Sequence, residues 1–155
     1  MKLRQWIPTV VVLAAAAGGG YYYWRSTGGG EDDRQQILEL VAGVERAVEE
    51  KRLSSVMDCV SQDYQDKSGN DRRALQQLMV AAFRDSQPFD VLVQVSDLQI
   101  NGNEATVRAE VEFSVGQPVG MGGSTRLTVA GKLRREAGGW RVYEAEGWEG
   151  AAQEF

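Results

Sequence analysis

The chain has 155 residues, with 17 Lys and Arg, 22 Asp and Glu, no His and one Cys. This length fits one domain with an appendage, and the lack of His excludes histidine bases, histidine metal ligands and serine–histidine–aspartate catalysis. The single cysteine, Cys59, excludes an internal disulfide and a two-cysteine metal or redox motif. A net charge of −5 disfavours nucleic acid, which requires a basic face.

The N-terminal segment predicts a membrane anchor. Lys2 and Arg4 precede an uncharged run, residues 6–24, which at about 1.5 Å per residue nearly spans the roughly 30 Å hydrocarbon layer. Trp6 stands at one end of the run and an aromatic cluster, residues 21–24, at the other, which is typical of the two interfacial belts of a spanning helix. We therefore expect contact with the lipid bilayer through residues 6–24.

Two interpretations of this segment stay open. Residues 1–25 form either an uncleaved transmembrane anchor, which we favour, or a cleaved secretory signal with a small-residue site in residues 14–17. Both keep the basic N-terminus inside and export the rest. The expected location is the bacterial inner membrane, single-pass, with the C-terminal domain in the periplasm.

The remainder divides into a Gly-rich tether over residues 26–30, a domain over residues 31–149 and a tail over residues 150–155. Residues 31–155 hold all 22 acids and 14 of the 17 bases, so their net charge is −8. This charge disfavours direct binding of the domain to anionic headgroups.

The first half of the domain predicts three helices. The apolar residues recur at three- and four-residue spacing in each. The first helix holds Ile37, Leu40, Val41, Val44 and Val48, and Glu31, Asp32 and Asp33 are expected to supply its cap and a favourable charge at its N-terminus. The second, capped by Ser54 or Ser55, holds Val56, Met57 and Val60, and the third, capped by Asn70 or Asp71, holds Leu75, Leu78, Met79, Ala82 and Phe83.

After Pro88 the period changes to two, which predicts strands. The alternating apolar residues are Phe89, Val91, Val93 and Val95, then Ala105 to Val115 at every second position, then Leu127, Val129 and Leu133. Asn101-Gly102 and Gly138-Gly139 predict turns, and residues 140–148 predict the last strand. The expected fold class is α+β, with three helices packed on a curved, four-stranded antiparallel sheet, preceded by a single transmembrane helix.

This order of elements resembles the nuclear transport factor two-like superfamily. The resemblance covers residues 32–149 and includes the string Ser61-x-Asp63-Tyr64-x-Asp66 and the closing strings of residues 139–142 and 146–148. It is closest to small bacterial domains tethered outside the membrane. It implies a cone whose mouth is the default pocket, and it does not choose between enzymes and noncatalytic modules.

The candidate pocket residues are Tyr64, Phe83, Met121, Trp140, Val142 and Trp148. On the last strand Glu144 and Glu146 share the parity of Trp140, and two carboxylates on an apolar face could serve as acid and base. The alternative, which we favour, is a bulge that turns both toward solvent or toward an arginine. Tyr64 with Asp63 could polarise a carbonyl as isomerases of this superfamily do, although packing of Tyr64 and turn formation by Asp63 and Asp66 are preferred.

Other residues suggest packing or turns. Asp63, Asp66, Asn70 and Asp71 lack the spacing of a calcium loop, so we expect no metal and no cofactor. Cys59 is expected to be an inert, packed thiol. The nine-residue, Gly-rich segment 116–124 is either a lid or partner contact, through Val119 and Met121, or a plain connector.

These observations favour a membrane-anchored, extracytoplasmic, noncatalytic domain that binds a small apolar ligand or an envelope protein, with a homodimer as a further option. The alternative is an isomerase- or hydrolase-type enzyme that uses pocket carboxylates with Tyr64.

Overall fold

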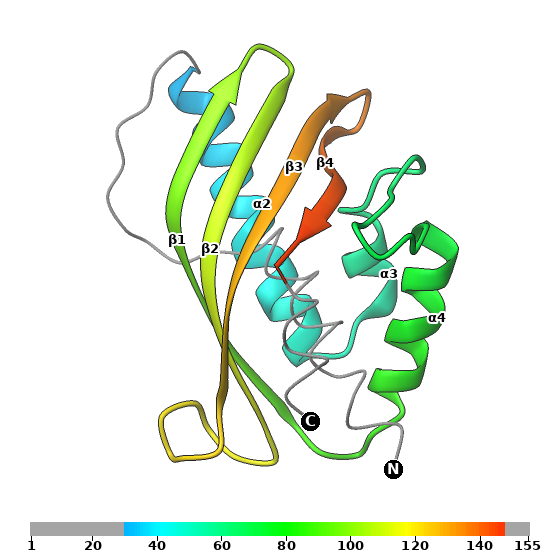
Figure 1. The fold of residues 1–155 in the computed structure, drawn as a ribbon, viewed down its shortest axis with the longest axis vertical. Helices are drawn as coiled ribbons and strands as arrows, with labels where there is room; N and C mark the ends of the chain where they lie inside the picture. The colour runs from blue at the N-terminus through cyan, green and yellow to red at the C-terminus, as the bar shows by residue number, and fades with distance from the viewer. Residues whose placement is uncertain (1–29, 148–155) are drawn as a thin grey trace.

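Helices precede strands in the computed structural model, which describes residues 30–147. The elements are α2 (Glu31–Glu49), α3 (Leu53–Met57), α4 (Arg72–Phe83), β1 (Phe89–Asn101), β2 (Glu104–Val115), β3 (Thr125–Glu136) and β4 (Gly139–Glu146) (Figure 1). This confirms the predicted α+β order. The expected anchor and Trp148 lie outside the described residues, and within residues 30–147 no helix is long and apolar enough to cross a membrane.

Two of the three predicted N-terminal helix caps are wrong. Helix α2 begins at Glu31 after Gly30, which makes no side-chain cap bond, so the acids lie inside the first turn and act on the helix dipole instead of capping it. Helix α3 begins at Leu53 with Arg52 at its N-cap, so the serine cap was wrong too, because the chain turns directly out of α2. Asp71 caps α4 as predicted, and its side chain accepts a 2.8 Å bond from the Ala74 amide.

Lys51 lies two residues after the last residue of α2 and joins this helix to the segment before β1. Its φ of 53° lies in the left-handed region, where its amide donates to the Val48 carbonyl oxygen at 3.0 Å. Its ammonium group donates to the carbonyl oxygens of Asp85 and Gln87, and it lies 4.7 Å from the centroid of the Phe89 ring. A position that usually suits glycine thus holds a lysine whose side chain bridges two elements.

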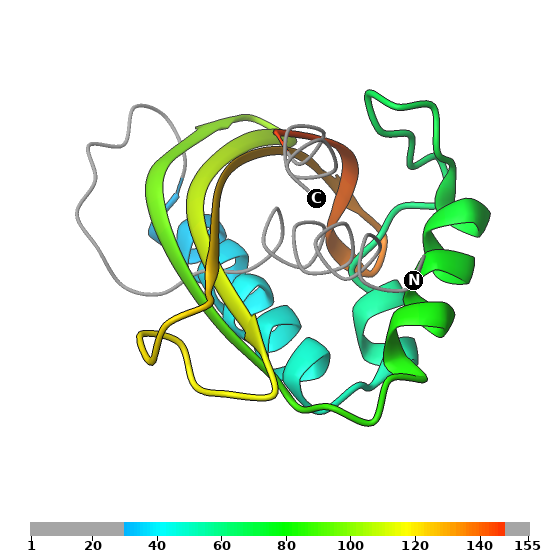
Figure 2. The same ribbon diagram turned by 60° about the horizontal axis from the view of Figure 1, so that its bottom comes forward.

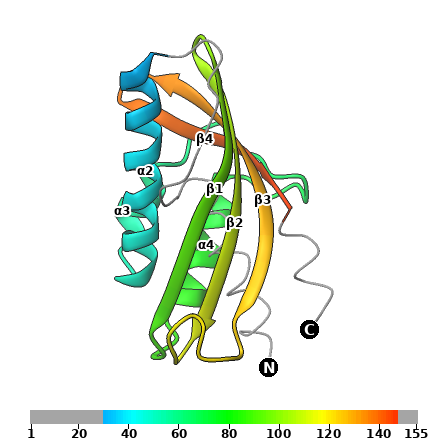
Figure 3. The ribbon, with the colours of Figure 1, turned by 90° about the vertical axis from the view of Figure 1, so that its left-hand side faces the viewer.

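The four strands form an antiparallel meander in the order β1-β2-β3-β4. Asn101 pairs with Glu104, which leaves the predicted two-residue turn with Gly102 at a φ of 63°. The inward side chains alternate with outward ones along each strand, and the register of β1 shifts between Val95 and Asp97. The sheet bends around α2 (Figures 2 and 3).

The concave side of the sheet is covered chiefly by α2. This helix packs against β1 and β4, α3 packs against α2, and α4 packs against α3 at the open side (Figures 1 and 2). The sequence predicted that all three helices share the roof, whereas the structure places α4 beside it. The buried side chains between the layers include Ile37, Val41, Tyr64, Leu75, Leu98, Leu133 and Trp140.

Both edges of the sheet are covered by other parts of the chain. At the β4 edge, Val60 forms a parallel bridge with Val142, and the Ser61 amide donates to the Val142 carbonyl oxygen at 2.8 Å. Val60 was predicted inside the second helix, but it pairs with β4 instead. At the β1 edge, two carboxylates of α2 accept bonds from strand amides, as described below. Such cover prevents edge-to-edge association.

Candidate functional site

The predicted pocket residues separate into three groups in the structure. Tyr64, Trp140 and Val142 are at most 2% exposed and belong to the core cluster. Phe83 is half-buried, with its ring centroid 6.2 Å from that of Phe89. Met121 is 74% exposed in the β2–β3 loop, and Trp148 lies outside the described residues. Tyr64, Trp140 and Val142 therefore pack in the interior, and Met121 faces solvent.

A bulge at Tyr143 decides where the two carboxylates of β4 lie. Val142 pairs with Leu133 and Glu144 pairs with Lys132, so β4 holds one extra residue at this point. Trp140 and Val142 stay on the inner face, whereas Glu144 turns outward. The shared parity of Glu144 with Trp140 was wrong, and the bulge alternative is what the structure contains.

Both glutamates form ion pairs with lysines, whereas the alternative had expected solvent or an arginine. The Glu144 carboxylate lies 3.0 Å from the Lys132 ammonium, which it hydrogen-bonds, and this raises the pKa of Lys132. The Glu146 carboxylate lies 3.1 Å from the Lys67 ammonium. Both carboxylates therefore contact surface cations and not an interior pocket.

Asp63 belongs to a polar network that joins the loop after α3 to β3. Its carboxylate lies 2.9 Å from Arg134, whose guanidinium also lies 2.9 Å from Glu136. The buried Ser61 hydroxyl donates to Glu136 at 2.6 Å and accepts from Arg134 at 3.1 Å. The bonds from Ser61 and Arg134 lower the pKa of Glu136. The network holds the loop to the sheet, and it keeps Asp63 away from the interior position of Tyr64.

The other residues of this loop shape the turn, as predicted. The buried Asp66 carboxylate accepts bonds from the Ser68 amide at 2.9 Å and from the Asn70 amide at 2.8 Å. Asp71 caps α4, so the polar residues of this loop make separate local contacts. Within residues 30–147, no group of three or more His, Cys, Asp or Glu is placed to hold a metal ion.

Cys59 is half-buried, and its thiol donates weakly to the Ser55 carbonyl oxygen at 3.5 Å. Burial raises its pKa, so the thiol form prevails at neutral pH. This environment agrees with the predicted inert role.

The sequence analysis missed two half-buried carboxylates on α2. Glu49 accepts a 3.1 Å bond from the Val91 amide, and Glu45 accepts a 3.2 Å bond from the Val93 amide. Burial is the main cause that raises the pKa of each carboxyl group, and the nearby acid Asp90 adds to it. The sequence signal for this pair was the presence of two acids four residues apart beside the apolar stripe of the helix. Such a pair more often faces solvent.

The segment 116–124 is held by hydrogen bonds within it and to the neighbouring strands β1 and β2. The Ser114 hydroxyl donates to the Gln117 carbonyl oxygen, the Gln117 side chain donates to the Gly122 carbonyl oxygen, and the Ser124 hydroxyl donates to Glu112 at 2.5 Å. The Val119 amide donates to Asp90 at 2.6 Å. This ordered loop carries Met121 into solvent.

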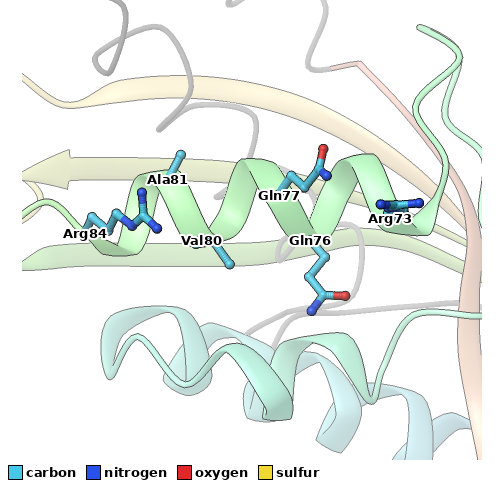
Figure 4. A pocket seen from close by; sticks show the side chains of 6 residues that line it. All are labelled: Arg73, Gln76, Gln77, Val80, Ala81 and Arg84. Carbon is cyan, nitrogen blue, oxygen red and sulfur yellow. The ribbon is translucent and has the colours of Figure 1, made fainter.

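Shallow hollows lie on the described surface. One of about 440 Å³ follows a single face of α4, from Arg73 to Arg84, with two glutamines, Val80 and Ala81 between the two arginines (Figure 4). A second, of about 390 Å³, lies over β3 and includes Lys67, Arg108 and Glu146. A third, of about 160 Å³, lies on the outer sheet face beside Leu92 and Arg126. Of the predicted site residues only Glu146 lines any of these hollows.

Comparison with solved structures identifies the fold. A protein of unknown function from Pseudomonas putida, described as nuclear transport factor two-like, matches with a TM-score of 0.65 and 15% identity over 77% of this chain and 88% of its own. A Nostoc punctiforme protein of unknown function with a cystatin-like fold matches with a TM-score of 0.61 and 20% identity over 78% and 93%. A candidate dehydratase of the nuclear transport factor two-like family from Streptomyces avermitilis matches with a TM-score of 0.63 and 12% identity over 74% and 94%.

No family model matches the sequence, and no curated protein matches it. The class of protein is therefore defined by its fold, an α+β cone with a bent antiparallel meander around a long helix. The chain has the nuclear transport factor two-like fold, as the sequence resemblance implied.

Proposed function

We propose that the chain is a membrane-anchored, extracytoplasmic, noncatalytic domain that binds an envelope protein. The observation that carries the noncatalytic part is the ion pairing of Asp63, Glu144 and Glu146 with Arg134, Lys132 and Lys67. These acids are the ones that an isomerase- or hydrolase-type mechanism would use, and each lies beside a cation at the surface instead of in an interior pocket.

A protein partner is favoured over a small apolar ligand because of where the apolar side chains lie. Tyr64, Trp140 and Val142, which would line a ligand pocket, are packed in the core. The large hydrophobic side chains exposed in the described part are Met121, at 74%, and Leu92, at 43%. An exposed methionine on a hydrogen-bonded loop suits contact with another protein.

The membrane anchor rests on the uncharged run with its aromatic ends. Leu13→Arg places a charge within this run, at a cost of about 2.5–3.5 kcal/mol for insertion near a helix centre. We expect the variant to leave the membrane fraction, whereas Leu13→Val stays there with the natural chain. Recovery of the natural chain in the soluble cytoplasmic fraction, or equal membrane recovery of Leu13→Arg, would contradict the anchor.

Binding is tested by native mass spectrometry of the detergent-solubilised full chain. A bound protein of defined mass supports the proposal, and an adduct of a small apolar molecule supports the ligand alternative. Glu144→Gln and Glu146→Gln are expected to leave either complex at its natural abundance. A large loss in these variants would show that the carboxylates touch the bound molecule and would favour the enzyme alternative.

A further inference from the structure

The covered edges of the sheet belong to β1 and β4, but β3 runs on past the end of β4. The pairing of β3 with β4 stops where Ala130 meets Glu146, whereas the pairing of β3 with β2 continues to Thr125. Figure 1 shows β3 continuing beyond β4 to the 116–124 loop. Residues 125–129, which we call the β3 overhang, are therefore an edge that no strand within residues 30–147 pairs.

The backbone groups of the β3 overhang alternate in direction. The Arg135 amide donates to the Asn103 carbonyl oxygen at 2.8 Å, so the odd-numbered residues of β3 bond toward β2. The pairing of β2 with β3 has no register shift, so the even-numbered residues face the other way. A Cβ on Gly147 would meet the Thr128 carbonyl oxygen, which agrees with this direction. The N–H and C=O groups of Arg126 and Thr128 thus point out of the open edge.

The rest of the chain does not suit this edge. If the register of β4 continued, Glu149 would lie opposite Leu127, whose half-buried side chain packs against the core. The Gly-Ala-Ala of residues 150–152 has low strand propensity, and Gly147 has a φ of 102° where the strand would have to continue. Residues 6–24 are assigned to the bilayer in the proposed function. A strand for the β3 overhang therefore comes from another molecule.

The side chains beside the β3 overhang define which strand fits it. On the inner face Leu127 offers an apolar neighbour. On the outer face the hollow of about 390 Å³ includes Thr128 and the exposed Arg108, whose guanidinium forms no ion pair within residues 30–147. Lys67 and Glu146 in the same hollow already pair with each other. A carboxylate over this hollow would be the counterion of Arg108.

We propose that the β3 overhang binds an extended segment of the envelope protein partner, which adds to the sheet as a strand. Its main chain bonds to Arg126 and Thr128, an acidic side chain lies over the hollow at Arg108, and an apolar side chain lies beside Leu127. This inference rests on the proposed function and names the surface and the kind of segment that serve it.

Two observations favour a partner protein over a second copy of this chain. Residues 31–155 carry a net charge of −8, so two copies repel each other. The loop that carries the exposed Met121 leads directly into the β3 overhang, so a partner that contacts Met121 reaches the open edge without crossing another element. The Arg126 side chain does not block this approach, because it pairs with Glu112 at 2.9 Å.

Thr128→Pro tests the main-chain bonds in the detergent-solubilised full chain. It removes an N–H that points out of the edge and keeps the bonds to β2, which the odd-numbered residues make. We expect the bound protein seen by native mass spectrometry to fall about tenfold or more, because a bond is lost and the ring obstructs the added strand. Thr128→Val, the matched control, keeps the amide and loses only the hydroxyl bond to Glu110, so the bound protein should stay at its natural abundance.

Arg108→Glu tests the charge and serves if Thr128→Pro fails to fold. It should lower the abundance of the bound protein several-fold, because it places a carboxylate beside the acidic side chain of the segment. Arg73→Glu, at an exposed arginine of α4 that is also in no ion pair of the described chain, should leave the abundance unchanged. Circular dichroism during thermal unfolding checks that each variant is folded.

Amide hydrogen exchange measured by NMR tests the edge itself. In the full chain separated from the bound protein, the Arg126 and Thr128 amides should exchange quickly and those of Leu127 and Val129 slowly, and in the complex all four should exchange slowly. Slow exchange at Arg126 and Thr128 in the separated chain would show that the chain covers its own edge and would overturn the proposal.

The outcomes separate this inference from the function on which it rests. A bound protein at its natural abundance in folded Thr128→Pro, or in folded Arg108→Glu, would overturn the β3 overhang as the site and leave the proposed function standing. Equal losses in Thr128→Pro and Thr128→Val would also overturn it, because the side chain would then be responsible. A natural chain with no bound protein would contradict the proposed function, and this inference with it.

Discussion

At the scale of single residues, the acids of this domain are of two kinds, which differ in what their carboxylates contact. Glu144 and Glu146 are bound to lysines at the surface. Glu45 and Glu49 are half-buried on α2, and they bind strand amides instead of a cation of the described chain. Burial raises the pKa of both acids of the second kind.

Glu45→Gln is expected to stabilise the domain at pH 7. The pKa of Glu45 is raised on folding, so the stability that its protonated form contributes is complete below the unfolded value and is lost as the pH rises through the folded value. Glutamine keeps the neutral form and can still accept from the Val93 amide. The gain should be less than about 1 kcal/mol because of solvent screening.

Thermal unfolding at pH 7 and at pH 4 measures this effect. The gain should disappear at pH 4, where the natural side chain is itself protonated. Glu39→Gln, an exposed position on the same helix, is the control and should change little at either pH. A gain for Glu45→Gln that grows at low pH would show that burial is not the cause.

At the scale of elements, two glycines differ in how closely the surrounding backbone approaches them, which the sequence does not show. Gly147 follows β4 with a φ of 102°, and a Cβ there would meet the Thr128 carbonyl oxygen and lie 3.1 Å from the Val129 Cα. Gly43 lies inside α2, and a Cβ added to it would meet nothing within 4 Å. Both are exposed glycines, yet only one is required by its surroundings.

Alanine at these two positions should have opposite effects. Gly43→Ala should raise the free energy of unfolding by about 0.5–1 kcal/mol, because glycine in a helix interior loses more backbone entropy on folding. Gly147→Ala should lower it by more than about 1 kcal/mol, because the clash is with backbone atoms and the φ is unfavourable for alanine. Urea unfolding of the two variants beside the natural chain measures both, and equal effects would contradict the packing at the end of β4.

At the scale of the whole molecule, the core is built from residues between α2 and β4. Both sheet edges are covered by segments of this same region, through Val60 and through Glu45 and Glu49. The fold therefore has its own core and its own edge protection, which are the requirements for an independent domain.

A chain that begins at Gly30 should keep the fold and lose membrane association. We expect its free energy of unfolding to agree with that of the full chain within about 1 kcal/mol, since the core of residues 30–147 is built from side chains that this shorter chain retains. Circular dichroism during thermal unfolding measures the fold, and fractionation measures the location. An unfolded truncated chain would show that the first 29 residues complete the core.

The sequence by itself determined the order and kind of the elements. Three- and four-residue spacing identified α2 and α4, alternation identified the strands, and Asn101-Gly102 located a turn, because these signals are local and periodic. Asp71 was identifiable as a cap for the same reason. The superfamily resemblance followed from that order.

Only the tertiary structure decided which side chains meet. One extra residue at Tyr143 turned Glu144 outward, and no local pattern marks such a bulge, because it depends on the pairing of β4 with β3. Val60 left the second helix to pair with β4, and Glu45 and Glu49 reached the edge of β1 about forty residues further along the chain. Partners of this kind are set by the packing of distant segments, which is why the sequence alone left two orientations open for the carboxylates of β4, while favouring the outward one, and overlooked the carboxylates of α2.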